Sequence, residues 1–130
     1  VDRWQIITYC PPSSVWLQVG TAVAGRGGRE AKGSDLLIDR NTVHILTPET
    51  KNSAHYFWIT SHKAGALTPA QEQTMFERSI EAFNEDLVII EAQSARLDPH
   101  SPTIDISADA AANAARKLLE KAIKAEADAG

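Results

Sequence analysis

The chain changes its pattern halfway along, from short runs of β-forming residues to long stretches with helical periodicity. Each run is rich in branched and aromatic residues and is bounded by turn formers, which is typical of β-strands. Because most connections between successive runs are short, we expect an antiparallel meander. The four predicted strands cover residues 4–10, 15–23, 41–47 and 53–60.

The breaks between these runs differ in character. The sequence Pro-Pro-Ser-Ser at residues 11–14 stops the first run, and residues 48–52 are turn-like. Residues 24–34 are rich in Gly, Arg and Lys and have no periodicity. We therefore expect residues 24–34 to form an exposed, mobile connection.

A long helix is predicted to follow the strands. Thr68 is a good N-cap, Pro69 suits the first helical position, and Gln71 completes a capping box. Apolar residues at spacings of four and three then form a stripe on one face, which favours a helix lying on a sheet. The helix should end by residues 96–99, since Pro disfavours helix in the residue before it. The stripe consists of Phe76, Ile80, Phe83, Leu87 and Ile90.

A second, alanine-rich helix is expected from about Ala108 to Ala127, with Ser107 as its N-cap. Strands followed by helices indicate the α+β class, an antiparallel sheet with helices on one face. Nothing obvious closes the two edges of a four-stranded sheet, and a strand-like run begins almost at Val1. We therefore expect the chain to be a piece of a larger protein.

Composition excludes several classes of partner and site. The net charge of −4 and the pI near 5.5 argue against a nucleic-acid partner or an anionic membrane surface. No segment approaches the ~20 apolar residues of a membrane span. Cys10 is the single cysteine, so this chain alone offers neither a disulfide nor an iron–sulfur site, and a reducing, cytoplasmic setting is expected.

The phase of the long helix singles out one carboxylate. At about 100° per residue, Asp86 lies about 80° from the centre of the apolar stripe, whereas Glu85 points away from it. Asp86 shares its flank with Ser79 and Gln93. A carboxylate there could be a metal ligand or a general base, or a partly solvated residue with a surface hydrogen bond.

Four histidines complete the candidate set. Within a strand, His44 would share its side of the sheet with Thr42 and Leu46. A triad of two histidines and a carboxylate suits non-haem iron(II), but the closely spaced histidine pair of such sites is absent. The alternative for each strand histidine is a hydrogen-bonded, half-buried residue. His44 and His55 fall in predicted strands, and His62 and His100 in loops.

Three segments together resemble a known family. Residues 43–50 and 55–58 resemble the signature H-x-L-T-P-E-T followed by H-Y-F-W in the oxygenase components of vanillate O-demethylase and dicamba demethylase. Residues 83–86 are similar to the E-D segment of the same family. The resemblance extends over essentially the whole chain and is weakest in residues 24–34.

The resemblance implies that residues 1–130 are the C-terminal part of the catalytic domain of a Rieske-type aromatic O-demethylase or monooxygenase. The implied fold is a helix-grip, Bet v 1-like sheet around a long helix. A [2Fe-2S] Rieske cluster would lie in an N-terminal domain outside this chain, and a mononuclear iron(II) would activate dioxygen. The isolated chain is expected to be inactive.

The resemblance also assigns two site residues. The carboxylate that completes the iron triad falls on Asp86, and the histidine that lines the substrate pocket falls on His44. The two histidine ligands of the iron lie upstream in the family. Where some relatives hold the substrate with Asn and Trp, this chain has Leu17 and Glu77, so the identity of the substrate stays open.

The implied partners are an aromatic substrate, a reductase or ferredoxin that donates electrons, and two further copies in a homotrimer of the full-length protein. The alternative from another class is a stand-alone Bet v 1-like module that binds an apolar ligand without catalysis. A purely structural or interaction domain, suggested by the alanine-rich helix, is a third reading. Upstream C-x-H and paired-histidine segments would favour the oxygenase.

Overall fold

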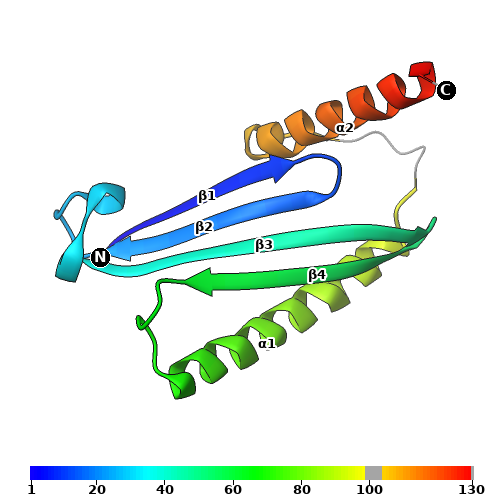
Figure 1. The fold of residues 1–130 in the computed structure, drawn as a ribbon. Coiled ribbons are helices and arrows are strands. Elements are labelled where there is room, and N and C mark those ends of the chain that lie inside the picture. The colour runs from blue at the N-terminus through cyan, green and yellow to red at the C-terminus, as the bar shows by residue number, and fades with distance from the viewer. Residues whose placement is uncertain (99–103, 130) are drawn as a thin grey trace. The chain divides into compact units, whose positions relative to one another are not determined.

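The computed structural model describes residues 1–98 and 104–129. Four strands form one antiparallel sheet in which neighbours along the chain are neighbours in the sheet (Figure 1). Two α-helices follow the strands, which confirms the predicted α+β class and the meander. The strands are β1 (Asp2–Cys10), β2 (Ser14–Ala22), β3 (Leu36–Thr50) and β4 (Ser53–His62), and the helices are α1 (Pro69–Ser94) and α2 (Ala110–Ala129).

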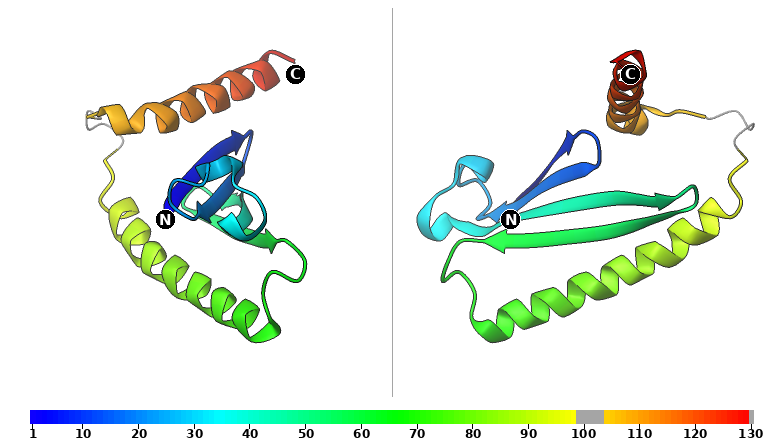
Figure 2. Two further views of the ribbon diagram at one scale, coloured as in Figure 1. Left: turned by 90° about the vertical axis from the view of Figure 1, so that its left-hand side faces the viewer. Right: turned by 45° about the vertical axis from the view of Figure 1, so that its right-hand side comes forward.

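A meander followed by a long helix and a C-terminal helix is consistent with the helix-grip fold. The sheet has the usual twist of antiparallel strands, which the two views of Figure 2 show. The described residues group into two compact units. All four strands and α2 belong to the first unit (Val1–Lys63 with Ser107–Gly130), and α1 belongs to the second (Ala64–Ile106).

The β3–β4 hairpin has a tighter turn than the sequence predicts. The two strands pair as far as Thr50 and Ser53, so only Lys51 and Asn52 form the turn. The prediction of a turn over residues 48–52 is therefore wrong, because most of that segment continues β3. Two-residue turns are the commonest connection of antiparallel neighbours.

A β-bulge explains how a proline can lie inside β3. The pairing register shifts between Pro48 and Thr50, and proline is tolerated in strands at such bulges. Glu49 is the extra residue at the shift. Its carboxylate oxygen Oε2 accepts a hydrogen bond of 2.9 Å from Ser53 Oγ, which ties the bulge to β4.

The connection between β2 and β3 is more regular than the sequence predicts. Residues 24–34 are mostly exposed, as expected, but Ala31 is buried. The backbone N–H of Gly25 donates to Asp2 Oδ2 at 3.0 Å and so joins the connection to the start of β1. Glycines with positive φ allow the chain to turn here. The two 3₁₀ turns of the connection are η1 (Gly28–Glu30) and η2 (Gly33–Asp35).

Trp4 fixes the pairing of β1 with β2. Its Cα partner across the two strands is Gly20. A Cβ atom on Gly20 would lie 2.0 Å from Cζ2 of the Trp4 indole, so the ring covers the glycine directly. Any larger residue at position 20 would displace the indole.

The N-terminus of α1 confirms the predicted capping box. Thr68 Oγ1 accepts from the Gln71 N–H, and Gln71 Oε1 accepts from the Thr68 N–H at 2.9 Å. The helix ends at Ser94, slightly before the predicted range. Pro99, which was expected to limit it, lies outside the described residues.

The start of α2 differs from the prediction. Ser107 does not cap the α-helix, because residues Ser107–Asp109 form a 3₁₀ turn, η3, and α2 begins only at Ala110. Terminal 3₁₀ turns of this kind are common, and a single Ser does not distinguish them from an α-helical start.

The described residues bury few side chains. Large apolar side chains stay exposed on the sheet and on α1, and the exposed fraction is 65% for Ile59 and 49% for Leu87 of the predicted stripe. None of the helices in the described part of the chain is long and apolar enough to cross a membrane. The buried residues are Val19, Gly20, Ala22, Ala31 and Thr42.

Candidate functional site

His44 lies in the middle of the sheet, on β3 between two partner strands. Its Cα partners are Val15 on β2 and Trp58 on β4. Because side chains alternate between the faces of a sheet, the register defines one face that carries His44. We call it the His44 face; it includes Arg3, Gln5, Ile7, Tyr9, Val15, Leu17, Val19, Thr21, Ile38, Arg40, Thr42, His44, Leu46, Tyr56, Trp58, Thr60 and His62.

A short hydrogen bond links His44 to Tyr56 on the neighbouring strand. The distance between His44 Nδ1 and Tyr56 Oη is 2.5 Å. The two ring planes are nearly parallel, at 4°, with centroids 5.9 Å apart. Stacked rings keep their atoms at least about 3.5 Å apart. The imidazole and the phenol therefore meet edge to edge.

Burial affects the charge of His44. Desolvation of the half-buried imidazole lowers its pKa from the ordinary value of 6.5, because the charged form is the costlier one to bury. The neutral ring is therefore the main form at pH 7, with one nitrogen as donor and the other as acceptor.

Other polar groups of the His44 face flank the histidine. Thr42 is buried, and its hydroxyl lies 3.0 Å from that of Thr60. Arg40 lies four residues before His44 on β3, roughly 13 Å away along the strand. Its Nε is buried and has no hydrogen-bond partner among the described residues. The face thus combines apolar side chains with hydrogen-bond donors and with the permanent positive charges of Arg40 and, on β1, Arg3.

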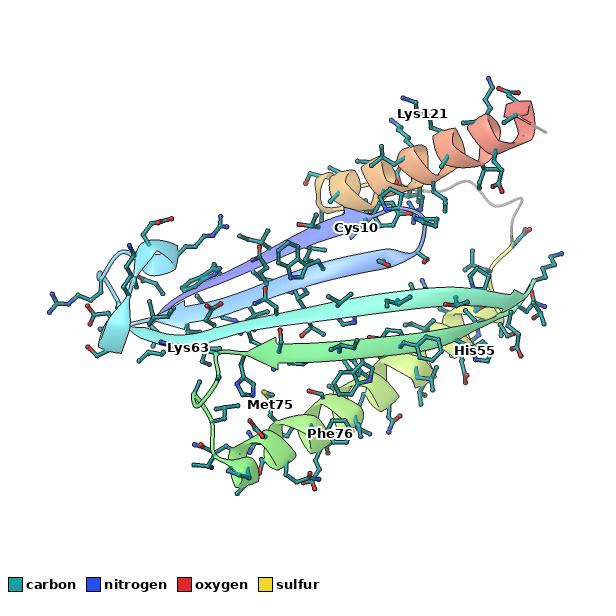
Figure 3. The ribbon with its side chains drawn as sticks, viewed as in Figure 1. Cys10, His55, Lys63, Met75, Phe76 and Lys121 are labelled. Atoms are coloured by element: carbon teal, nitrogen blue, oxygen red, sulfur yellow. The ribbon has the colours of Figure 1, made fainter. Side chains whose placement is uncertain are left out.

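Two other histidines lie near the two ends of β4. His55 is on the opposite face, near the β3–β4 turn, with its Nε2 3.6 Å from Glu49 Oε1 (Figure 3). Both of those side chains are more than half exposed, at 58% and 52%. His62 is the last residue of β4, and its Nδ1 lies 3.1 Å from the Lys63 carbonyl. His100 lies outside the described residues.

Asp86 is carried by α1 and has an exposed side chain. The half-buried side chains of α1 are Met75, Ser79 and Phe83, which recur every four residues. At about 100° per residue, Asp86 lies about 20° from the centre of that flank and Glu85 about 120° from it. The two adjacent carboxylates therefore project from different sides of the helix.

Asp86 can supply one ligand to a metal ion. Its carboxylate has no hydrogen bond or ion pair within the described part of the chain. Across residues 1–98 and 104–129, no three His, Cys, Asp or Glu side chains gather into a group that could hold a metal. The donors present therefore fit one anionic position of an iron(II) site, and further ligands would have to come from other residues.

The sequence pattern did not single out Tyr56 or Arg40 as site residues. Tyr56 follows His44 by twelve residues, and their contact depends on the register of a hairpin that the sequence pattern leaves undefined. The contact would have been predicted only by assuming a two-residue turn at Lys51 and Asn52 together with one bulged residue in β3. Arg40 carried no signal beyond its place four residues before His44.

Known proteins match nearly the whole chain. The family of vanillate O-demethylase oxygenase C-terminal domains matches residues 1–125. The iron-sulfur subunit of the toluene-4-sulfonate monooxygenase system of Comamonas testosteroni is 32% identical over 96% of this chain and 37% of its own length. A vanillate O-demethylase oxygenase subunit of a Pseudomonas strain is 35% identical over 97% of this chain and 39% of its own length.

A more distant relative is the oxygenase component of dicamba O-demethylase of Stenotrophomonas maltophilia, with 30% identity over 71% of this chain and 26% of its own. No solved structure matches the chain. The chain spans less than two fifths of the length of the relatives described here. On the match over residues 1–125, the chain belongs to the family of vanillate O-demethylase oxygenase C-terminal domains.

Proposed function

We propose that this chain is the C-terminal portion of the oxygenase component of a Rieske-type aromatic O-demethylase or monooxygenase. The family match over residues 1–125 carries the proposal. Two further observations support it: relatives of more than twice the length, and large apolar side chains left exposed in the described residues. A portion of a larger catalytic domain would bury such surface against the rest of the protein. No observation favours a stand-alone binding module.

In this role Asp86 would be the carboxylate ligand of the mononuclear iron. The support is its side of α1, its lack of another partner among the described residues, and its place in the E-D segment. Iron held there, with two histidines from upstream, would supply oxygen activation. This chain's share of that site is one negative oxygen ligand.

His44 would bind the substrate. A neutral imidazole on a face that also carries apolar side chains can orient an aromatic molecule through one hydrogen bond. The positive charge of Arg40 on the same face favours an anionic ring substituent. The relatives named for vanillate and toluene-4-sulfonate suggest the class, an aromatic carboxylate or sulfonate.

The complete protein would work with other components. We propose a reductase or ferredoxin as electron donor to a [2Fe-2S] cluster upstream of this chain, a homotrimeric assembly, and a cytoplasmic location. These proposals come with the family resemblance.

The test compares two variants of the complete oxygenase. Asp86→Asn keeps the shape of the side chain but removes the anionic ligand. It should abolish turnover and lower the mononuclear iron content while leaving the iron–sulfur absorbance unchanged. Glu85→Gln, on a different side of α1, is the matched control and should retain both iron and activity. The reverse result, with loss only in Glu85→Gln, would refute the assignment of Asp86.

A further inference from the structure

We infer that Tyr56 is a positioning residue for His44: its phenol donates to Nδ1 and holds the neutral imidazole with its proton on Nε2. His44 then offers a donor to the substrate and selects molecules that present an acceptor, such as a carboxylate or sulfonate oxygen. The inference rests on the proposed function in so far as it makes His44 a substrate-binding residue.

The geometry fits a hydrogen bond directed at the nitrogen lone pair. The lone pair of an imidazole nitrogen lies in the plane of the ring. Tyr56 Oη approaches Nδ1 to 2.5 Å, and the two rings are within 4° of parallel. The phenol therefore meets the edge of the imidazole, where the lone pair points, and not its face.

The direction of the hydrogen bond follows from the acidity of the two groups. A phenol, with a pKa of roughly 10, is a far stronger acid than the N–H of a neutral imidazole. The imidazole nitrogen, with a conjugate-acid pKa of roughly 6.5, is in turn the better base. The O–H of Tyr56 therefore donates and Nδ1 accepts. With Nδ1 as acceptor, the ring proton of a neutral histidine must lie on Nε2.

The sheet itself places the two rings together. Tyr56 pairs with Leu46, two residues beyond His44, so the two side chains are diagonal neighbours on the His44 face. Without the bulge, the register set by the Thr50–Ser53 pair would place His44 opposite Ile59. Phe57 would then share its face in place of Tyr56. The extra residue, Glu49, thus determines which side chain meets the histidine.

The experiment measures the affinity of the complete oxygenase for vanillate and for toluene-4-sulfonate, without electron donor. Tyr56→Phe keeps the ring and removes the hydroxyl. For the acid that the wild type binds more tightly, this variant should raise Kd by about two- to tenfold, which is the effect of losing one neutral hydrogen bond. Iron content should stay unchanged. Tyr9→Phe is the matched control, since among the described residues this phenol donates to the Pro12 carbonyl of the β1–β2 turn.

A double-mutant cycle separates positioning from packing. In a His44→Ala background, Tyr56→Phe should have no further effect on affinity, because the tyrosine acts through the histidine. The inferred hydrogen bond also favours the neutral ring. The His44 inflection in the pH profile of affinity should therefore move to higher pH in Tyr56→Phe, whereas a purely structural role would leave it in place.

The outcomes distinguish the inference from the proposed function. If His44→Ala weakens binding and Tyr56→Phe does not, the inference alone is overturned. An equal loss from Tyr56→Phe with and without His44 would also overturn it, since the tyrosine would then act independently. If neither acid binds the wild type, or if His44→Ala binds as tightly as the wild type, the proposed role of His44 fails and the inference with it.

Discussion

Replacing His44 with Ala should weaken the binding of an aromatic acid without loss of iron. The imidazole is half-buried and in its neutral form donates one hydrogen bond. A hydrogen bond to an anionic acceptor contributes about 1.5–3 kcal/mol. That range corresponds to a roughly ten- to hundredfold rise in Kd. His44→Gln, which keeps a side-chain N–H donor, should recover part of the loss.

The measurement is a calorimetric titration of the complete oxygenase with the acid, together with iron content and Tm of the same preparation. His55→Ala is the matched control, because His55 lies on the opposite face of the sheet. Among the described residues, its imidazole nitrogen Nε2 pairs with the exposed carboxylate of Glu49. Exposed pairs of that kind contribute about 0–1 kcal/mol, so the control should bind normally. A fall in Tm of His44→Ala with unchanged affinity would refute the reasoning and make His44 a scaffold residue.

Two further predictions concern the His44 face. Burial lowers the pKa of His44, so the native state binds fewer protons than the unfolded chain, and stability should fall as the pH drops below about 6.5 and through the lowered pKa. Thermal melts between pH 7.5 and 5 should show a smaller acid loss for His44→Gln, and equal losses would contradict the assignment. Thr42→Val removes one of two hydroxyls 3.0 Å apart and should lower stability by about 1 kcal/mol. Adding Thr60→Val should recover part of that loss in thermal midpoint, and a double variant less stable than either single one would argue against the pair.

Local signals in the sequence predicted most of the elements. The capping box of Thr68 and Gln71 involves atoms three residues apart, so its geometry follows from the sequence alone. The strands likewise follow from runs of β-forming residues between breaks. The exact turn of the β3–β4 hairpin did not, because Pro48 suggests an interruption and only the pairing of β3 with β4 shows that the strand continues.

Register limited the prediction of the candidate site. Alternation along β3 correctly placed His44 with Thr42 and Leu46 on one face, since that requires only neighbours in one strand. Which β4 residues join them depends on a single bulged residue, Glu49. A shift of one residue transfers all β4 side chains to the other face, so Tyr56 could not be assigned to His44 from the pattern.

Helical periodicity was also an incomplete guide to the polar residues of α1. Periodicity grouped Ser79, Asp86 and Gln93 into one polar line, because the three positions are a heptad apart. Ser79, however, donates its hydroxyl to the Met75 carbonyl one turn earlier, at 2.9 Å, and so is satisfied within α1. A serine engaged in this way has no need of a ligand, whereas the Asp86 carboxylate has no partner among the described residues. The polar line therefore reduces to an exposed carboxylate without a partner among the described residues and an amide one heptad beyond it. That difference, which spacing alone does not reveal, supports our proposal that Asp86, and not Ser79, is the residue of this flank that binds a metal.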